Sequence, residues 1–170
     1  MPLTSPRAGL LLVATPLLND PNFSRSVVLL LSHDGDGTLG VILDRPTTIE
    51  VGEYLPAWEP VATAPPVVFA GGPVEPDIGI GVCLRFGSIE LVDLGHDPVD
   101  DSPVRVFAGC AGWGPGQLES ELDEGAWFVV DFDHGDLLDP EPDNLWSAVL
   151  RRQNSRLALF SSFPSDPAMN

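Results

Sequence analysis

A glycine-rich segment, Gly109–Glu119, has the clearest potential for chemistry. It reads Gly-Cys-Ala-Gly-Trp-Gly-Pro-Gly-Gln-Leu-Glu and follows an apolar run, so we expect a strand-to-helix turn. Backbone N–H groups at a helix N-terminus, approached closely because glycine lacks a Cβ, can hold a phosphate or carboxylate. The segment lacks the lysine of a P-loop and the glycine spacing of a dinucleotide fingerprint. Gly112, Trp113 and Gln117 are its candidate binding residues, and a tight turn that lets Trp113 pack is the favoured alternative.

A second glycine pair, Gly71 and Gly72, could add to such a site. The pair follows an apolar run that ends at Ala70 and precedes Pro73. Glycine tolerates unusual backbone angles and proline fixes φ, so the simpler interpretation is a turn between strands. The sequence leaves open whether the two glycine segments lie side by side.

Two arginines, Arg25 and Arg45, are further candidates for binding an anion. Arg25 lies in the segment Asp20–Val28, which we interpret as a single turn capped by Asp20 and leading into a strand. An arginine facing a cleft would suit an anionic ligand. For Arg25, a local ion pair with a carboxylate is the simpler interpretation.

Patterns for catalysis and metal binding are weak. Cys110 lies shortly before the expected helix, whose dipole could lower the thiol pKa. An inert core thiol is favoured, because free cysteine is among the most buried residue types and no histidine is near in sequence. The acidic run Asp131–Asp136, which includes one histidine, could bind a metal, but a polar turn is the simpler interpretation. We therefore predict no catalytic residue, no metal site and no cofactor.

Composition limits the partners. The 170 residues include 25 acidic and 8 basic ones, all eight of them arginine, for a net charge of −17. Nucleic-acid binding draws on clustered basic residues, so direct binding to DNA is disfavoured, and a small anion or a protein remains as partner. Two cysteines without a CxxC pattern suit a reducing compartment. The longest strongly apolar runs, Leu10–Ala14 and Val27–Leu31, are too short to span a membrane. We expect one cytoplasmic domain over residues 1–170.

Strand-like runs dominate the chain. The turn Asp34–Gly37 joins two of them and predicts a hairpin. Several runs are apolar throughout, so we expect both of their faces to be covered. The expected strands are Leu10–Ala14, Ser26–Ser32, Thr38–Leu43, Val67–Ala70, Ile78–Arg85, Ile89–Val92, Val104–Ala108, Trp127–Asp131 and Leu157–Phe160.

Two helices are predicted from capping signals. The first begins after Gly114, with Gln117 reaching back to the cap, and stops at Gly125. The second begins after an Asp139 cap. Its apolar stripe consists of Leu145, Trp146, Val149 and Leu150, with Arg151 and Arg152 in the last turn.

Short motifs occur in a fixed order along the chain: Ala14-Thr15-Pro16, Asp20–Val28, His33, Gly40-Val41-Ile42, Arg45-Pro46, Gly71-Gly72-Pro73, Ala111-Gly112-Trp113, Gly116–Glu121 and Ala126-Trp127. Taken together, their order and spacing resemble the YqgE/AlgH family over nearly the whole chain. The resemblance implies a small, bacterial, cytoplasmic α+β protein with a largely antiparallel, partly barrel-like β-sheet flanked by helices. Its biochemical function is essentially unassigned, and some members are labelled transcriptional regulators.

The sequence departs from this family pattern at two points. Many relatives place a helix between the strands that correspond to Ile89–Val92 and Val104–Ala108, where this chain has a link rich in proline and aspartate. Cys110 occupies a position where relatives often have an aromatic residue. Any thiol chemistry would therefore be peculiar to this protein.

Three hypotheses for function follow. The leading one is a non-enzymatic binding or regulatory module, because no nucleophile, base and metal occur in a readable arrangement. The alternative is a small-molecule enzyme, or an anion- or nucleotide-binding protein, that uses the Gly109–Glu119 turn. A regulator that binds DNA directly is the least supported, because the chain is so acidic.

Overall fold

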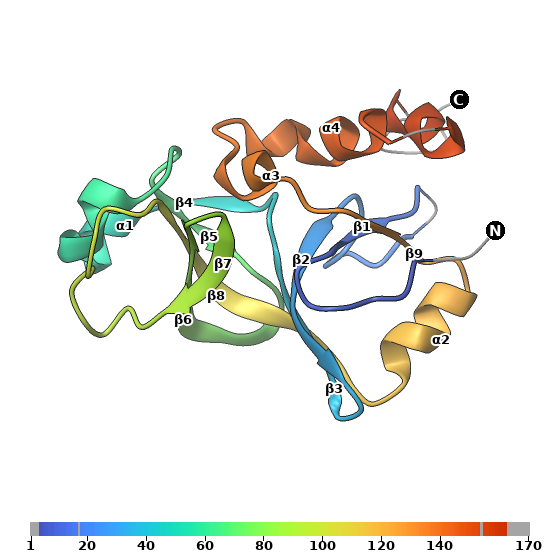
Figure 1. Cartoon of the computed structure of the whole chain (residues 1–170), viewed down its shortest axis with the longest axis horizontal. Helices are drawn as coiled ribbons and strands as arrows, with labels where there is room; N and C mark the ends of the chain where they lie inside the picture. Colours follow the sequence, from blue (N-terminus) through green and yellow to red (C-terminus); the bar gives the residue numbers. More distant parts are fainter. Residues whose placement is uncertain (1–3, 17, 154, 163–170) are drawn as a thin grey trace.

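The computed structural model describes residues 4–16, 18–153 and 155–162. Nine strands form one sheet in the order β4-β5-β8-β3-β2-β1-β9, with β6 on β8 and β7 on β6. The named strand pairs are antiparallel except β5 with β8. The predicted α+β class and largely antiparallel sheet are confirmed, and the sheet is open rather than closed into a barrel (Figure 1). The strands are β1 (Leu11–Ala14), β2 (Val27–Asp34), β3 (Gly37–Ile42), β4 (Pro46–Glu50), β5 (Val67–Ala70), β6 (Val74–Arg85), β7 (Ser88–Val92), β8 (Val104–Trp113) and β9 (Trp127–Val130).

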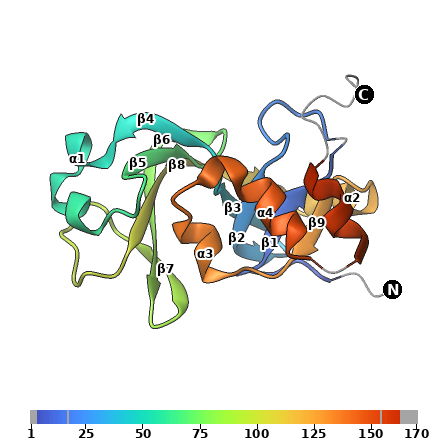
Figure 2. The same cartoon turned by 90° about the horizontal axis from the view of Figure 1, so that it is seen from above.

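Short helices cover both faces of the sheet. α3 and α4 lie over one face, while α1 and α2 lie at opposite ends of the molecule (Figures 1 and 2). None of the helices within the described residues is both long and apolar enough to cross a membrane. The helices are α1 (Val51–Tyr54), α2 (Gln117–Asp123), α3 (His134–Leu138) and α4 (Leu145–Arg151), with 3₁₀ segments η1 (Pro56–Val61), η2 (Pro142–Asn144) and η3 (Ser155–Ser162).

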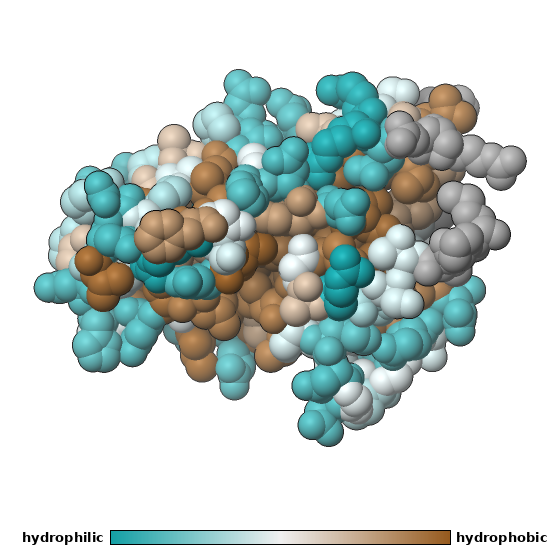
Figure 3. Space-filling model, in the orientation of Figure 1, coloured by the Kyte–Doolittle hydropathy of each residue, from teal (hydrophilic) through white to brown (hydrophobic). Residues whose placement is uncertain are grey.

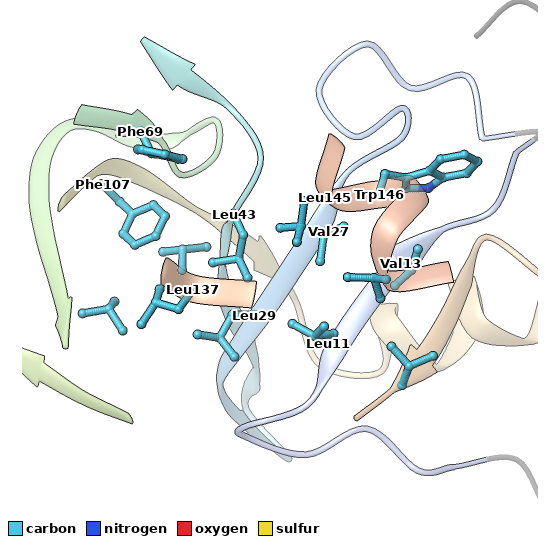
Figure 4. Close-up of a cluster of buried hydrophobic side chains, with 14 of the residues drawn as sticks. Leu11, Val13, Val27, Leu29, Leu43, Phe69, Phe107, Leu137, Leu145 and Trp146 are labelled. Atoms are coloured by element: carbon cyan, nitrogen blue, oxygen red, sulfur yellow. The ribbon is translucent and has the colours of Figure 1, made fainter. Parts of the chain in front are cut away.

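The largest core cluster lies between the sheet and the helices α3 and α4. Because successive strand residues point to opposite faces, Leu11 and Val13 enter this cluster while Leu12 and Ala14 enter the cluster beneath α2. Both faces of β1 are thus buried, as the continuous apolar run predicts. A third cluster packs beneath α1 and η1. Figure 4 shows the first cluster, with Leu11, Val13, Val27, Leu29, Leu43, Phe69, Phe107, Leu137, Leu145 and Trp146 labelled.

Several predicted elements are confirmed. Asp34 pairs with Gly37 at the end of the β2–β3 hairpin. The predicted stripe of α4 is buried, with Leu145, Trp146, Val149 and Leu150 at most 2% exposed. Between β7 and β8, residues 93–103 form no helix, as their content of proline and aspartate predicts.

Other predictions are wrong in ways that have physical causes. Asp139 does not cap α4: its Oδ1 accepts the Glu141 N–H in a local turn, and the helix begins at Leu145. The run Leu157–Phe160 lies in the 3₁₀ segment η3 instead of a strand. There Phe160 stacks on Phe128, at 5.7 Å between ring centroids, so packing rather than β-propensity determines the local structure.

The short elements that were missed include β4 and α3. β4 has a proline at its start and mostly exposed residues, so it lacks the apolar pattern of a strand. It forms because Pro46 and Glu50 pair with Phe69 and Val67 of β5. The segment expected as a polar turn after β9 contains α3, which Asp133 and Asp136 stabilise with a capping box.

Candidate functional site

The glycine pair Gly71-Gly72 lies where the chain crosses over strand β8. β5 and β6 both pair with Phe107 and Ala108, so they occupy opposite edges of β8. Only residues 71–73 connect β5 to β6. This short link passes across β8 and brings Val74 opposite Cys110. The expected turn between strands is therefore a strand crossing.

Glycine is required at this crossing because backbone meets backbone. A Cβ on Gly109 would lie 2.5 Å from the carbonyl oxygen of Gly72, and one on Gly72 would lie 2.5 Å from Ala111 N. A Cβ on Gly71 would overlap the carbonyl oxygen of Gly109. The crossing thus brings the Gly71-Gly72 pair against Gly109–Ala111, which answers what the sequence left open. These glycines allow the two backbone segments to lie in contact, so they serve the fold.

The Gly109–Glu119 segment is mostly strand. β8 continues through Trp113, where Gly112 pairs with Leu39 of β3, so the expected turn shrinks to residues 114–116. Helix α2 begins at Gln117, later than predicted, because Gly116 adopts a left-handed φ of 74°. Cys110 therefore lies inside a strand and away from the helix dipole that was expected to activate it.

The Gln117 side chain closes the turn that precedes α2. Gln117 Oε1 accepts the Gly114 N–H at 2.9 Å, as predicted. This N–H would have been a donor to an anion. At the other end, the N–H groups of Gly125 and Ala126 donate to carbonyls of the last turn, which confirms Gly125 as the stop.

Sequence reasoning missed Glu121, the central acceptor beneath α2. Its Oε1 accepts the indole N–H of Trp113 at 3.0 Å and of Trp127 at 2.9 Å. Its Oε2 accepts the Gln117 amide at 2.9 Å. The two indoles pack edge to face with centroids 5.9 Å apart. Trp113 is thus a structural anchor, and the presence of two tryptophans near an acidic helix was the available signal.

A second polar pair lies beside this anchor. His33 Nδ1 is 2.6 Å from Thr38 Oγ1, and His33 Nε2 is 3.1 Å from Glu119 Oε1. The contacts tie α2 to the β2–β3 hairpin. A carboxylate beside the imidazole opposes a bound anion at this position, because the like charges repel.

The two candidate arginines also make internal contacts. Arg45 donates to the Ser24 carbonyl and lies 3.2 Å from the Asp44 carboxylate. The Arg25 guanidinium stacks 4.0 Å above the Trp146 ring, and burial lowers its pKa. Both side chains hold the segment before β2 against its neighbours.

Asp44 is a buried carboxyl that sequence reasoning missed. It is 6% exposed, and its Oδ1 accepts the Val27 N–H at 3.1 Å. Burial raises the pKa of Asp44 to about 6, and the nearby Arg45 guanidinium opposes that rise. The pKa of Asp44 is thus raised toward neutrality, but the contacts of this carboxyl hold the chain in place.

Arg105 is a buried cation whose partners are carbonyls. It is 2% exposed, stacks 4.4 Å from the Phe69 ring, and has its pKa lowered to about 10 by burial. The sequence signal that could have identified Arg105 as buried is its position between two valines of an apolar strand. It donates to the carbonyl oxygens of Thr63, Ala64, Pro65, Leu137 and Asp139, so it joins α3 to the loop before β5.

Neither cysteine is activated as a nucleophile. Burial is the main cause that raises the thiol pKa of both Cys83 and Cys110, and Glu75 raises that of Cys110 further. The acidic run after β9 is used in the fold: Asp133 caps α3, and the Asp136 carboxylate receives two 2.7 Å hydrogen bonds from Arg152. Among the described residues, no group of three or more histidine, cysteine, aspartate or glutamate side chains is placed to hold a metal ion.

A surface cavity of about 250 Å³ lies beside the β6–β7 hairpin, away from all the predicted site residues. Trp58 and Cys83 contribute apolar walls, while Asp93, Asp97 and Asp100 contribute carboxylates. Asp100 is bound by Arg85, whose hydrogen bond holds the pKa of that carboxyl at about 2. The negative lining disfavours an anionic ligand.

Comparison with known proteins defines the family. A UPF0301 protein of Streptomyces coelicolor is 50% identical over 182 residues, covering 95% of this chain and 94% of that protein. A crystal structure from Corynebacterium diphtheriae superposes with a TM-score of 0.90 at 33% identity, covering 96% and 95% of the two chains. The solution structure of the AlgH protein of Pseudomonas aeruginosa gives a TM-score of 0.67 at 28% identity, covering 95% and 97%. The AlgH-like family model DUF179 matches residues 11–158, and the chain therefore belongs to that family.

Proposed function

We propose that this protein is a non-enzymatic binding module of the cytoplasm that acts by docking another protein. One observation carries the proposal: the groups that could have formed a small-molecule site are used inside the fold. Gly71, Gly72 and Gly109 lie in a close backbone crossing, and the Gln117 side chain binds the Gly114 N–H. Arg45 is paired with Asp44. A partner must then be recognised by an outer surface.

The alternative, an enzyme or an anion-binding protein built on Gly109–Glu119, has less support. Its nucleophile would be Cys110, whose thiol pKa is raised rather than lowered. Its anion donor would be the Gly114 N–H, which already donates to Gln117. Direct binding to DNA has the least support, because a net charge of −17 repels a phosphate backbone.

The proposal is tested by three measurements on the purified protein. We expect no turnover of a panel of phosphoesters, carboxylic esters and nucleotides. We also expect no rise in the thermal midpoint with nucleotides, phosphorylated metabolites or organic acids, although a ligand at 100 times its Kd would add about 2.7 kcal/mol. In extracts of the native host, the tagged protein should elute from gel filtration in a larger complex than the purified chain.

Two results would overturn it. Turnover that Cys110→Ser or Gln117→Ala abolishes would establish the enzyme alternative. A midpoint shift with an anion, lost in Gln117→Ala and kept in the exposed helix variant Glu124→Ala, would establish the anion-binding alternative. Glu124 serves as the control because it belongs to the same helical segment and is exposed.

A further inference from the structure

Apolar residues form a continuous row across four neighbouring strands at one end of the sheet. Leu39 of β3 pairs with Gly112 of β8, and Val74 of β6 pairs with Cys110 of β8. Leu31 lies at the irregularity of β2 next to Leu39. Leu31 and Cys110 pack against the core cluster beneath α3 and α4, so the row continues that face of the sheet. We call it the apolar face: Leu31, Leu39, Val74, Ile78, Cys110 and Gly112.

No described helix seals this part of the sheet. Leu39 is 47% exposed, Val74 39% and Ile78 51%. By contrast, Val27, Leu29 and Val41, farther along β2 and β3, are fully buried. Figure 3 shows hydrophobic residues gathered at the centre of the visible surface, between the β6–β7 hairpin and β2. Exposed apolar surface bordered by polar residues marks interaction sites in soluble proteins.

Gly112 contributes no side chain to the apolar face. A Cβ there would lie 3.4 Å from Val74 Cγ2 and 3.7 Å from Leu39 Cδ2, which is ordinary contact. Unlike the glycines of the crossing, Gly112 is not required by the backbone. Gly112 is partly exposed, so an apolar group of another molecule can contact its Cα beside these two aliphatic side chains.

The charges around the apolar face indicate the charge of the partner that would bind there. Asp34 and Asp36 lie at the tip of the β2–β3 hairpin, and Glu75 and Asp77 adjoin Val74 and Ile78. Glu75 acts on the Cys110 thiol, which places its charge next to the face. The four strand segments that form the face, residues 27–34, 37–42, 74–80 and 109–113, contain no arginine. Negative charge at this rim attracts a cationic partner and repels phosphate groups.

We propose that the apolar face docks a segment of a partner protein that presents aliphatic side chains flanked by lysine or arginine. This rests on the proposed function and names the surface and chemistry of the partner. A second copy of the chain is disfavoured because a two-fold contact would place like acidic rims together. Anionic membranes and nucleic acids are repelled for the same reason.

The probe is a fluorescent amphipathic peptide of leucine and lysine, titrated with the full chain and followed by anisotropy. We expect binding to weaken as the salt concentration rises. We also expect Leu39→Gln to bind at least about tenfold more weakly, which is the typical loss of affinity when a residue at the centre of an interface is replaced. The matched control is Leu159→Gln, because Leu159 is 76% exposed but lies on η3. Bound peptide should also slow alkylation of Cys110, with the buried Cys83 as internal reference.

Several outcomes would overturn the proposal. It fails if the peptide does not bind, if Leu39→Gln and Leu159→Gln weaken binding equally, or if a leucine–glutamate peptide binds as well. It also fails if the chain alone dimerises and Leu39→Gln makes it monomeric, since the occupant is then a second copy. If the peptide does not bind at this face and no substrate turnover is found, the proposed binding function stands and the partner binds another surface.

Discussion

Strand β8 contains two glycines, three residues apart, in opposite surroundings. At Gly109 an added Cβ would lie 2.5 Å from the Gly72 carbonyl oxygen, whereas at Gly112 the nearest atom would be 3.4 Å away. Gly109 has a left-handed φ of 77°, and Gly112 has no such angle. The same residue type therefore supports the fold at one position and shapes an open surface at the other.

The difference extends to the residues around each glycine. Beside the crossing, buried polar groups hold the chain: Asp44 binds the Val27 N–H, and Arg105 joins α3 to the loop before β5. At the far end of β8, Glu121 holds Trp113 on the α2 side, and the opposite side is left open and apolar. A polar or glycine-rich motif is thus no sign of a ligand site until its contacts are known.

The largest effect is expected at the crossing. Gly72→Ala places a Cβ against the Cys110 carbonyl group and forces a side chain onto a φ of 151°. Overpacking and backbone strain each cost about 1–3 kcal/mol, so we expect a loss of roughly 3–5 kcal/mol in the free energy of unfolding, measured in urea. If the variant is too unstable to purify, the soluble yield measures the same loss. An unchanged midpoint would show that the crossing can relax, and the contrast with Gly112 would disappear.

The buried carboxyl near the crossing should make stability depend on pH. The pKa of Asp44 is raised to about 6 in the folded state, so its contribution to stability is full below about pH 4 and is lost as pH rises through 6. A shift of about 2 units corresponds to roughly 3 kcal/mol. We expect the unfolding free energy of the wild type, relative to Asp44→Asn, to fall by up to that amount between pH 4 and 7.

Urea unfolding of both proteins across this range measures the effect. Asp44→Asn is a suitable reference because its amide oxygen can still accept the Val27 N–H, while the titrating proton is gone. A difference that stays constant with pH would show that Asp44 has an ordinary pKa. The crossing region would then be less tightly closed than its 6% exposure indicates.

A smaller effect is expected where α2 anchors the far end of β8. Glu121→Gln places an amide N–H₂ opposite the Gln117 amide, which cannot turn without losing the Gly114 N–H. Hydrogen bonds to charged groups contribute about 1.5–3 kcal/mol, and partial exposure reduces this, so we expect a loss of about 1–2 kcal/mol. Unfolding followed by tryptophan fluorescence measures it. Glu124→Gln, at an exposed position in the same segment, should lower the free energy of unfolding far less. Equal losses in the two variants would show that the charge on the helix, and not the hydrogen bonds of Glu121, causes the effect.

The sequence predicts those features that depend on neighbouring residues. The β2–β3 hairpin, the hydrogen bond from Gly114 to Gln117, the Gly125 stop and the apolar stripe of α4 are all local, and all are found. The crossing of β8 is not local, because it brings Gly72 against Ala111 through the pairing of three strands. The same holds for Arg105, whose carbonyl partners lie more than thirty residues away in sequence.

The candidate site was harder to predict than the fold for a related reason. Glycines and arginines that suit an anion are the same residues that suit a close crossing or an internal ion pair, so only their contacts decide. Gly71, Gly72 and Arg45 turned out to serve the fold. The exposure of Leu39 and Val74 was hidden in the sequence, because an apolar strand residue has the same pattern whether or not a helix covers it.

The smallest expected effect is also the sharpest test of the comparison. Gly112→Ala adds a Cβ at ordinary contact distance within a strand, where alanine is favoured over glycine by roughly 0.5–1 kcal/mol. We expect a small gain in the free energy of unfolding, opposite in sign to Gly72→Ala. If a partner's side chain contacts the backbone at Gly112, the same substitution should weaken binding of the leucine–lysine peptide. A variant that is more stable but binds the peptide less well would show that Gly112 serves the binding surface and is not needed for the fold. A loss of stability would instead show that Gly112 is required by the fold, like the glycines of the crossing.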